Sequence, residues 1–295
     1  MIQDDIKVDR LSSEDNPETV KKEKKEKKEK PVKEKKEKKE KKEKKEKKEK
    51  VIKEENKLLM KYQSDLSIYE IGIDEAGRGP LFGRLYVAAT ILPKVCENEN
   101  NDLFYHKDIK DSKKIKSKKK MDIVSQYIQS NTLAYSIQYI EHSEIDEINI
   151  RQAVFRAAHR CIKEVCNTVL EKDPSAKFHI LMDGNDFIPY TTFDKSVDRI
   201  VSIPYDTIEG GDAKLVSIAA ASILAKDSRD KYIEALCIEY PALVERYSLD
   251  KNMGYGTKKH LDGIKEFGIC QFHRRTYGQC KMARMNEIYN NLVII

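Results

Sequence analysis

Apolar and polar residues follow strand and helix spacings from about residue 68 onwards. An apolar, β-branched run, Ile68, Ile71 and Ile73, leads into Asp74 and Glu75 and then into a glycine turn. This pattern predicts a buried strand that is closed by the turn and has both acids at its end. Similar runs predict strands at 85–92, 133–140, 178–182 and 198–203, and helical spacing predicts helices at 121–128, 150–170 and 258–267. Strands mixed with helices over this length predict an α/β domain.

Acidic residues recur where predicted elements end or begin. Asp183 follows the strand at 178–182, and Asp212 follows two glycines at the start of a helix rich in small residues. Neighbouring residues of a regular strand point to opposite faces, so Asp74 and Glu75 can share a site only where Gly77 and Gly79 let the chain leave the pleat. The competing interpretation is a surface turn with solvated acids.

If the four acids meet at one edge of a sheet, their charges repel unless cations lie among them. Carboxylate oxygens select Mg²⁺ or Mn²⁺ rather than zinc, and the sequence has no Cys/His cluster typical of a zinc site. Two such ions can bind the attacking and leaving oxygens of a phosphodiester. The pattern therefore indicates metal-dependent phosphodiester chemistry.

The first part of the chain has a different composition. Residues 21–50 repeat Lys-Lys-Glu and hold 19 lysines against 9 glutamates, a net charge of +10, whereas residues 1–20 sum to −4 and the remainder sums to zero. Such a segment lacks the apolar residues that build a core. We expect residues 1–66 to be a solvated tail and linker, mobile or partly helical, and residues 67–295 to be one domain.

Cysteine and apolar content restrict the location of the protein. The six cysteines include no Cys-x-x-Cys pair, and no apolar stretch reaches the roughly 18 residues of a membrane span. The N-terminus also lacks a basic region followed by an apolar one. These features predict an intracellular protein, cytoplasmic with a nuclear location left open, that does not bind membranes.

Several motifs carry a family resemblance. They are Gly72 to Pro80, Asp111-Ser-Lys113, Met182-Asp-Gly184, Gly211 to Lys226 with Arg229-Asp230, Gly254 to Thr257, and His273-Arg274. With these motifs in the family's order over roughly residues 67–280, the chain resembles type 2 ribonuclease H and most closely bacterial ribonuclease HII. The resemblance implies an RNase H-like fold, with a central mixed β-sheet flanked by helices and a C-terminal helical segment.

The resemblance also implies an activity. It predicts a monomeric endoribonuclease that uses Mg²⁺ or Mn²⁺ to cleave the RNA strand of RNA–DNA hybrids, and ribonucleotides embedded in duplex DNA, leaving 5′-phosphate and 3′-hydroxyl ends. A non-catalytic nucleic-acid-binding subunit and a 3′-exonuclease are the alternatives. Loss of one of the four acids would favour the subunit, and none is missing, whereas the Gly-Arg-Gly motif suits an internal ribonucleotide better than a 3′ end.

Individual roles follow from the same resemblance. The family's metal-binding carboxylates fall on Asp74, Glu75, Asp183 and Asp212. The motif that recognises the ribose 2′-hydroxyl falls on Gly77, Arg78 and Gly79, and the tyrosine that stacks on the next sugar at an RNA–DNA junction falls on Tyr255. Basic positions near the substrate backbone fall on Lys113, Lys226 and Arg229. We interpret Asp230 as an ion-pair partner and His273 as a packed or phosphate-side residue rather than a general base.

Overall fold

A computed structural model shows how these elements are arranged. The structure describes residues 58–59, 62–65, 67–93, 109, 112, 115, 117–194 and 197–288. The Lys/Glu tail lies outside these residues. The compact unit begins at Leu58, and Leu59 donates its N–H to the Lys214 carbonyl at 2.8 Å. The end of the predicted linker therefore belongs to the domain. None of the described helices is long and apolar enough to cross a membrane.

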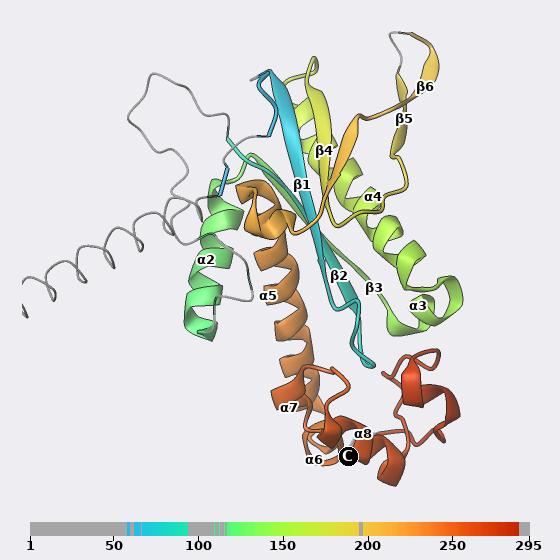
Figure 1. The fold of residues 1–295 in the computed structure, drawn as a ribbon. Coiled ribbons are helices and arrows are strands. Elements are labelled where there is room, and N and C mark those ends of the chain that lie inside the picture. Colours follow the sequence, from blue (N-terminus) through green and yellow to red (C-terminus); the bar gives the residue numbers. More distant parts are fainter. Residues whose placement is uncertain are drawn as a thin grey trace, which may run out of the picture. The chain divides into compact units, whose positions relative to one another are not determined.

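The domain is built on a mixed five-stranded sheet (Figure 1). Its order is β3-β2-β1-β4-β7, with β1 antiparallel to β2 and parallel to β4. The strands are β1 (Ile68–Ala76), β2 (Leu85–Ile91), β3 (Ala134–Ile140), β4 (Lys177–Asp183) and β7 (Tyr205–Ile208). A separate hairpin consists of β5 (Thr191–Asp194) and β6 (Arg199–Ser202). The predicted fold class is confirmed.

Helices cover both faces of the sheet. On one face α4 (Ile150–Leu170) packs on the side chains of Ile71 and Ile73 from β1 and their neighbours in β2, such as Val87. On the other face α5 (Val216–Glu239) packs with α2 (Lys118–Asn131) against residues such as Ala88. The alternation of apolar residues along β1 and β2 thus supplies two separate cores.

Small residues let α5 approach β1 closely. A Cβ atom on Gly72 would lie 2.4 Å from the backbone carbonyl carbon of Ser217. Ala219, Ala220 and Ala221 of the same helix are fully buried. This close packing presents the first half of α5, including Ser222, to the end of β1 that carries Asp74.

A third core joins the C-terminal elements. These are α6 (Ala242–Tyr247), α7 (Leu249–Asn252), α8 (Lys258–Phe267) and the short 3₁₀ helix η3 (Gly278–Met282). Phe82, from the turn between β1 and β2, is fully buried in this core with Tyr247. The turn after the two carboxylates of β1 is therefore anchored in the C-terminal segment. Between β3 and α4 lies α3 (His142–Ile148), and η2 (Gly211–Ala213) precedes α5.

The first predicted strand runs into the glycine turn, as expected. β1 continues to Ala76, because Glu75 and Ala76 keep their pairing with Val87 and Tyr86 of β2. Both acids therefore lie within the strand, and the chain leaves the pleat only at Gly77. The helix predicted at 150–170 also has the observed bounds of α4.

Candidate active site

The register of the parallel strands brings two of the predicted acids together. Ile73 of β1 pairs with Met182 of β4, so the residues that follow, Asp74 and Asp183, lie side by side at the ends of neighbouring strands. Asp74 is buried, with 6% of its surface exposed. Carboxyl ends of adjacent parallel strands in a mixed sheet are a common place for a ligand site.

Asp212 reaches the same end of the sheet through η2. The N–H of Gly211 donates to Oδ1 of Asp183 at 2.7 Å, which holds η2 against the end of β4. A Cβ on Gly211 would lie 2.5 Å from the Cδ1 atom of Ile218 and 3.3 Å from Oδ1 of Asp183, so η2 packs closely against both side chains. Asp212 is buried next to it.

Burial and electrostatic repulsion raise the pKa of two of these acids, Asp74 and Glu75. Burial, followed by repulsion from Glu75 and Asp183, raises the pKa of Asp74 well above its usual range. Burial also raises the pKa of Glu75, which Arg78 opposes by an ion pair at 3.3 Å between Nη1 and Oε1. Buried carboxylates in this arrangement are suited to bind a cation that offsets their charge. Within the described residues, however, no group of three or more acids, histidines or cysteines has the geometry of a formed metal site.

Ser222 of α5 connects Asp74 to the Asp111-Ser-Lys113 motif. A hydrogen bond from Ser222 favours the ionised form of Asp74. The Ser222 hydroxyl also lies 3.0 Å from the buried hydroxyl of Ser112. The motif thus reaches the acids through its serine, while Lys113 lies outside the described residues.

The Gly-Arg-Gly turn is held by one buried arginine. Arg274 is fully buried and donates from Nη2 to the Gly77 carbonyl at 2.7 Å, from Nη1 to the Arg78 carbonyl at 3.1 Å, and from Nε to the Gly83 carbonyl at 2.9 Å. The Arg78 side chain is itself 53% exposed. The turn therefore combines a fixed backbone with an accessible guanidinium.

Tyr255 lies next to this turn. Its ring is half-exposed, and its Cε1 atom would be 3.9 Å from a Cβ placed on Gly79. Arg229 lies beneath, with its guanidinium carbon 5.7 Å from the centre of the Tyr255 ring. Arg229 is 2% exposed, and its Nη2 donates to the Met253 carbonyl at 2.8 Å. Its observed contacts support two loops, and the contact with the substrate backbone stays a prediction.

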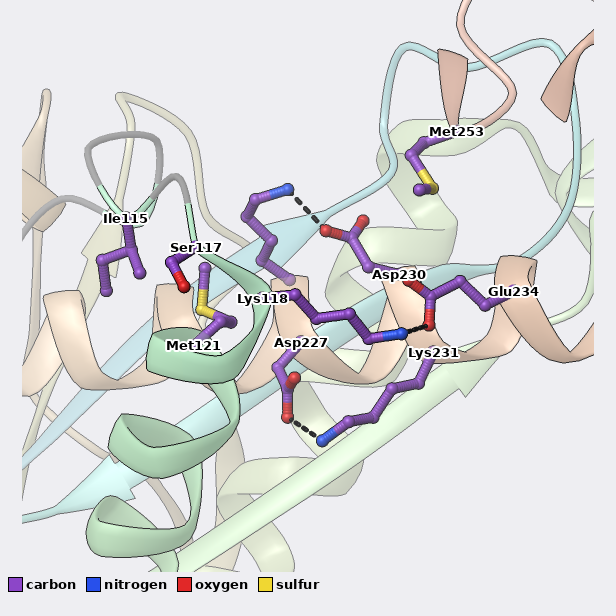
Figure 2. Close-up of a pocket in the computed structure, with 10 residues that line it drawn as sticks. Ile115, Ser117, Lys118, Met121, Asp227, Asp230, Lys231, Glu234 and Met253 are labelled. Carbon is purple, nitrogen blue, oxygen red and sulfur yellow. Dashed lines mark hydrogen bonds and ion pairs between the residues drawn. The ribbon is translucent and has the colours of Figure 1, made fainter. Parts of the chain in front are cut away.

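Lys226 lies in a pocket of about 200 Å³ between α2 and α5 (Figure 2). Its Nζ donates to Asp230 at 2.7 Å, which confirms the interpretation of Asp230 as an ion-pair partner. The neighbouring Lys118 and Lys231 are paired in the same way, with Glu234 and Asp227. Lys226 keeps about a third of its side chain exposed, so the ion pair fixes it without removing it from solvent.

Comparisons with known proteins decide the family. The family model described as Ribonuclease HII matches residues 71–280. The chain belongs to the ribonuclease HII family. It is 40% identical over 208 residues to ribonuclease HII of Parabacteroides distasonis, covering 70% of this chain and 89% of that protein. With ribonuclease HII of Bacteroides thetaiotaomicron it shares 39% identity over 224 residues, 74% and 94% of the two chains.

A solved structure agrees on the fold. The ribonuclease H2 from Pyrococcus horikoshii matches with a TM-score of 0.50 at 22% identity, over 72% of this chain and 96% of that one. Ribonuclease HII enzymes are divalent-metal-dependent endoribonucleases with RNase H activity on RNA–DNA hybrids. The predicted family and enzyme class are therefore confirmed.

Sequence reasoning gave no role to two residues of this ribonuclease HII site. Arg274 stood in a matched motif, but nothing in the sequence shows that its side chain reaches back to carbonyls at 77–83. Ser222 lies within a run of small helical residues that indicates packing. An arginine that is expected to be buried and has no carboxylate partner must donate to other acceptors, such as backbone carbonyls. This is the feature that could have indicated the role of Arg274.

Proposed function

We propose that this ribonuclease HII cleaves on the 5′ side of ribonucleotides, in hybrids and as single residues in duplex DNA, by two-metal-ion hydrolysis. The products carry 5′-phosphate and 3′-hydroxyl ends. The observation that carries the proposal is the position of the Gly-Arg-Gly turn, which immediately follows the paired acids of β1 and lies beside the Tyr255 ring. A ribose bound at that turn has its phosphate near the acids.

Each part of the site has a separate task. Asp74, Glu75, Asp183 and Asp212 hold Mg²⁺ or Mn²⁺, which when bound supplies an activated water and stabilises charge on the leaving oxygen. The backbone of the turn approaches the 2′-hydroxyl, because Gly77 allows its positive φ and Gly79 leaves the space that a side chain would occupy. Tyr255 stacks on the sugar that follows, and Lys226 faces the substrate backbone.

The carboxylates fit this role on structural grounds. Burial and the charge of Asp183 raise the pKa of both Asp74 and Glu75, and a divalent cation would remove that repulsion. The choice between Mg²⁺ and Mn²⁺, the monomeric state and the cytoplasmic location stay predictions.

Product analysis tests the proposal. Full-length protein is incubated with an RNA–DNA hybrid, with duplex DNA carrying one ribonucleotide, and with all-DNA duplex, with Mg²⁺, with Mn²⁺ or with chelator. We expect internal nicks in the first two substrates alone, and none with chelator. Products shortened stepwise from a 3′ end would support an exonuclease, and binding without cleavage would support the non-catalytic subunit.

Substitution of single acids identifies the site. Asp74→Asn and Asp183→Asn should each abolish cleavage with the fold intact, because the amide keeps the shape but removes the charge that holds metal. Asp212→Asn should also impair cleavage. The control is Asp262→Asn, an exposed acid of α8, which should keep full activity. Near-normal turnover of Asp74→Asn or Asp183→Asn would contradict the assignment.

A further inference from the structure

Two buried histidines connect the loop of Tyr255 to the segment that holds the Gly-Arg-Gly turn. His260 in α8 is fully buried and His273 is 1% exposed, and their Nε2 atoms lie 3.0 Å apart. Nδ1 of His260 lies 3.0 Å from the Tyr255 carbonyl oxygen. The N–H of Cys270 donates to Nδ1 of His273 at 3.0 Å. We call this chain, Tyr255–His260–His273–Cys270, the histidine bridge.

The two ends of the histidine bridge determine where its protons lie. A carbonyl oxygen can only accept, so Nδ1 of His260 carries the proton that bonds to Tyr255. A backbone N–H can only donate, so Nδ1 of His273 is unprotonated and its Nε2 carries the proton. That proton is donated to the bare Nε2 of His260. Both rings are therefore neutral, and each is in a different tautomer.

The same segment is attached to the Gly-Arg-Gly turn by its backbone. His273 forms an antiparallel bridge with Phe82, and the N–H of Arg274 donates to the Leu81 carbonyl at 2.8 Å. The next residue of the segment, Arg274, also binds the Gly77 carbonyl through its side chain. One end of the histidine bridge is thus fixed to the turn, and the other end is fixed to the backbone of Tyr255.

We propose that His260 and His273 are positioning residues that set the place of Tyr255 relative to the Gly-Arg-Gly turn, and thereby the preference for an RNA–DNA junction. A role in packing alone would not need the directional bonds of the histidine bridge. The inference rests on the proposed function, because it assumes that Tyr255 stacks on the sugar that follows the bound ribose. A displaced ring would lose that contact while the acids keep theirs.

A matched pair of substitutions separates positioning from packing. The amide nitrogen of Asn can replace the Nδ1–H donor of His260, and the amide oxygen of Gln can replace its Nε2 acceptor. His260→Asn therefore keeps the donor to the Tyr255 carbonyl and loses the hydrogen bond with His273. His260→Gln keeps the hydrogen bond with His273 and loses the one to the Tyr255 carbonyl. Both remove a buried ring, so their costs in packing are similar.

The measurement is the ratio of kcat/KM on duplex DNA with one ribonucleotide to kcat/KM on an all-RNA hybrid. We expect His260→Gln to lower this ratio roughly tenfold, toward the value of Tyr255→Ala, because small displacements of a positioning group have effects of this order. His260→Asn should stay near the wild-type ratio. Equal ratios for the two His260 variants would overturn the proposal.

Tyr255→Ala separates a failure of the role proposed for Tyr255 from a failure of the role proposed for the histidine bridge. If wild-type protein cleaves neither substrate, or if Tyr255→Ala leaves the ratio unchanged, the proposed function of Tyr255 fails, and with it the link to specificity. The histidine bridge itself is tested without cleavage by nitrogen NMR of histidine-labelled full-length protein. The spectrum should show His260 protonated at Nδ1 and His273 protonated at Nε2. Each histidine signal is assigned by its disappearance when that histidine alone is substituted. Any other pair of tautomers would overturn the proposal even where a variant fails to fold.

Discussion

Gly77 and Gly79 stand two residues apart in one turn but have different constraints. Gly77 has a φ of +95°, and a Cβ there would lie 2.3 Å from Nε of the buried Arg229. Gly79 has an ordinary φ, and its nearest neighbour would be Tyr255 at 3.9 Å. The first glycine is needed by the fold itself, and the second leaves space that a bound ribose can use.

Alanine at the two positions should therefore produce different defects. We expect Gly77→Ala to lower the free energy of unfolding by about 1–3 kcal/mol, since it adds backbone strain and a contact with Arg229. Gly79→Ala should change stability by less than about 0.5 kcal/mol yet raise KM for a hybrid, because its methyl group faces the substrate. Denaturant unfolding and steady-state cleavage measure the two effects. Equal loss of stability in both variants would contradict the distinction.

The four acids could be predicted from the sequence because each follows an apolar run or a glycine pair. The pattern alone could only suggest their grouping, which the family resemblance implied, because it depends on the pairing of β1 with β4 across about a hundred residues of sequence. The role of Arg274 was also beyond reach, because its hydrogen-bond partners are carbonyls, which every residue has. The role of a single residue can therefore be predicted where its interaction depends on a particular side chain, and not where it depends on backbone groups that every residue has.

At the scale of elements, the turn between β1 and β2 depends on the segment after α8. Arg274 supplies three donors to carbonyls of this turn. Burial lowers its pKa to about 10, so it stays charged at neutral pH. The turn has no such support from its own residues, and its shape is therefore determined by a segment almost two hundred residues away.

Arg274→Lys should disturb both stability and cleavage. Lysine cannot reproduce the planar fork, so at least one buried carbonyl loses its donor, at a cost of about 1–3 kcal/mol in the free energy of unfolding. We expect kcat/KM to fall on both hybrid and single-ribonucleotide substrates. The fall should be at least as large as the decrease in the folded fraction that follows from the lower free energy of unfolding. Arg275→Lys is the matched control, since that side chain is exposed. Similar behaviour of the two variants would show that Arg274 does not hold the turn.

The junction of α8 with the following segment should also be sensitive to acid. Burial lowers the pKa of His273 to about 3, whereas an unfolded histidine has a pKa of about 6.5. Between these values the unfolded chain binds a proton that the native protein does not, so stability falls as pH falls. The contribution is complete above about pH 7, and about 2 kcal/mol of it is lost by pH 5.

Comparison with His273→Gln isolates this effect, because glutamine does not titrate. The difference in the free energy of unfolding between wild type and variant should be constant above pH 7 and should shrink below pH 6.5. Urea unfolding at several pH values measures it. A difference that is independent of pH down to pH 5 would mean that the pKa of His273 is the same in the native and the unfolded protein.

Long, periodic elements were predictable, and the strand predicted at 198–203 is observed as the short strand β6. The short strands β5 and β7 were not predicted. α4 and α8 had their observed bounds because their apolar residues repeat at helical spacing along one face. β7 was missed because its four residues are exposed or half-buried, and its place is determined by pairing with β4. Strand pairing also determines the end of β1, which continues past Asp74 because its residues pair with β2 as far as Tyr86.

At the scale of the whole molecule, charge is divided between two parts of the chain. Residues 21–50 have a net charge of +10, whereas residues from 58 onwards sum to zero. Lys118, Lys226 and Lys231 of the domain are paired locally in the α2–α5 pocket. General attraction to phosphates should therefore come mainly from the tail, and recognition of the substrate should come from the domain.

Deletion of residues 1–57 tests this division. The structure favours this boundary over a longer deletion, because Leu58 is buried and Leu59 bonds to Lys214 and Val216. We expect turnover at saturating substrate to be unchanged and KM to rise at low salt, since fewer counterions are released on binding. The dependence of log KM on log salt should be less steep without the tail. At high salt the two forms should converge, because the screening length falls to roughly 3 Å at molar ionic strength. If the slope is unchanged by deletion, the glutamates neutralise the lysines locally, and the attraction to phosphates must then come from Arg78, Lys226 and other exposed cations of the domain.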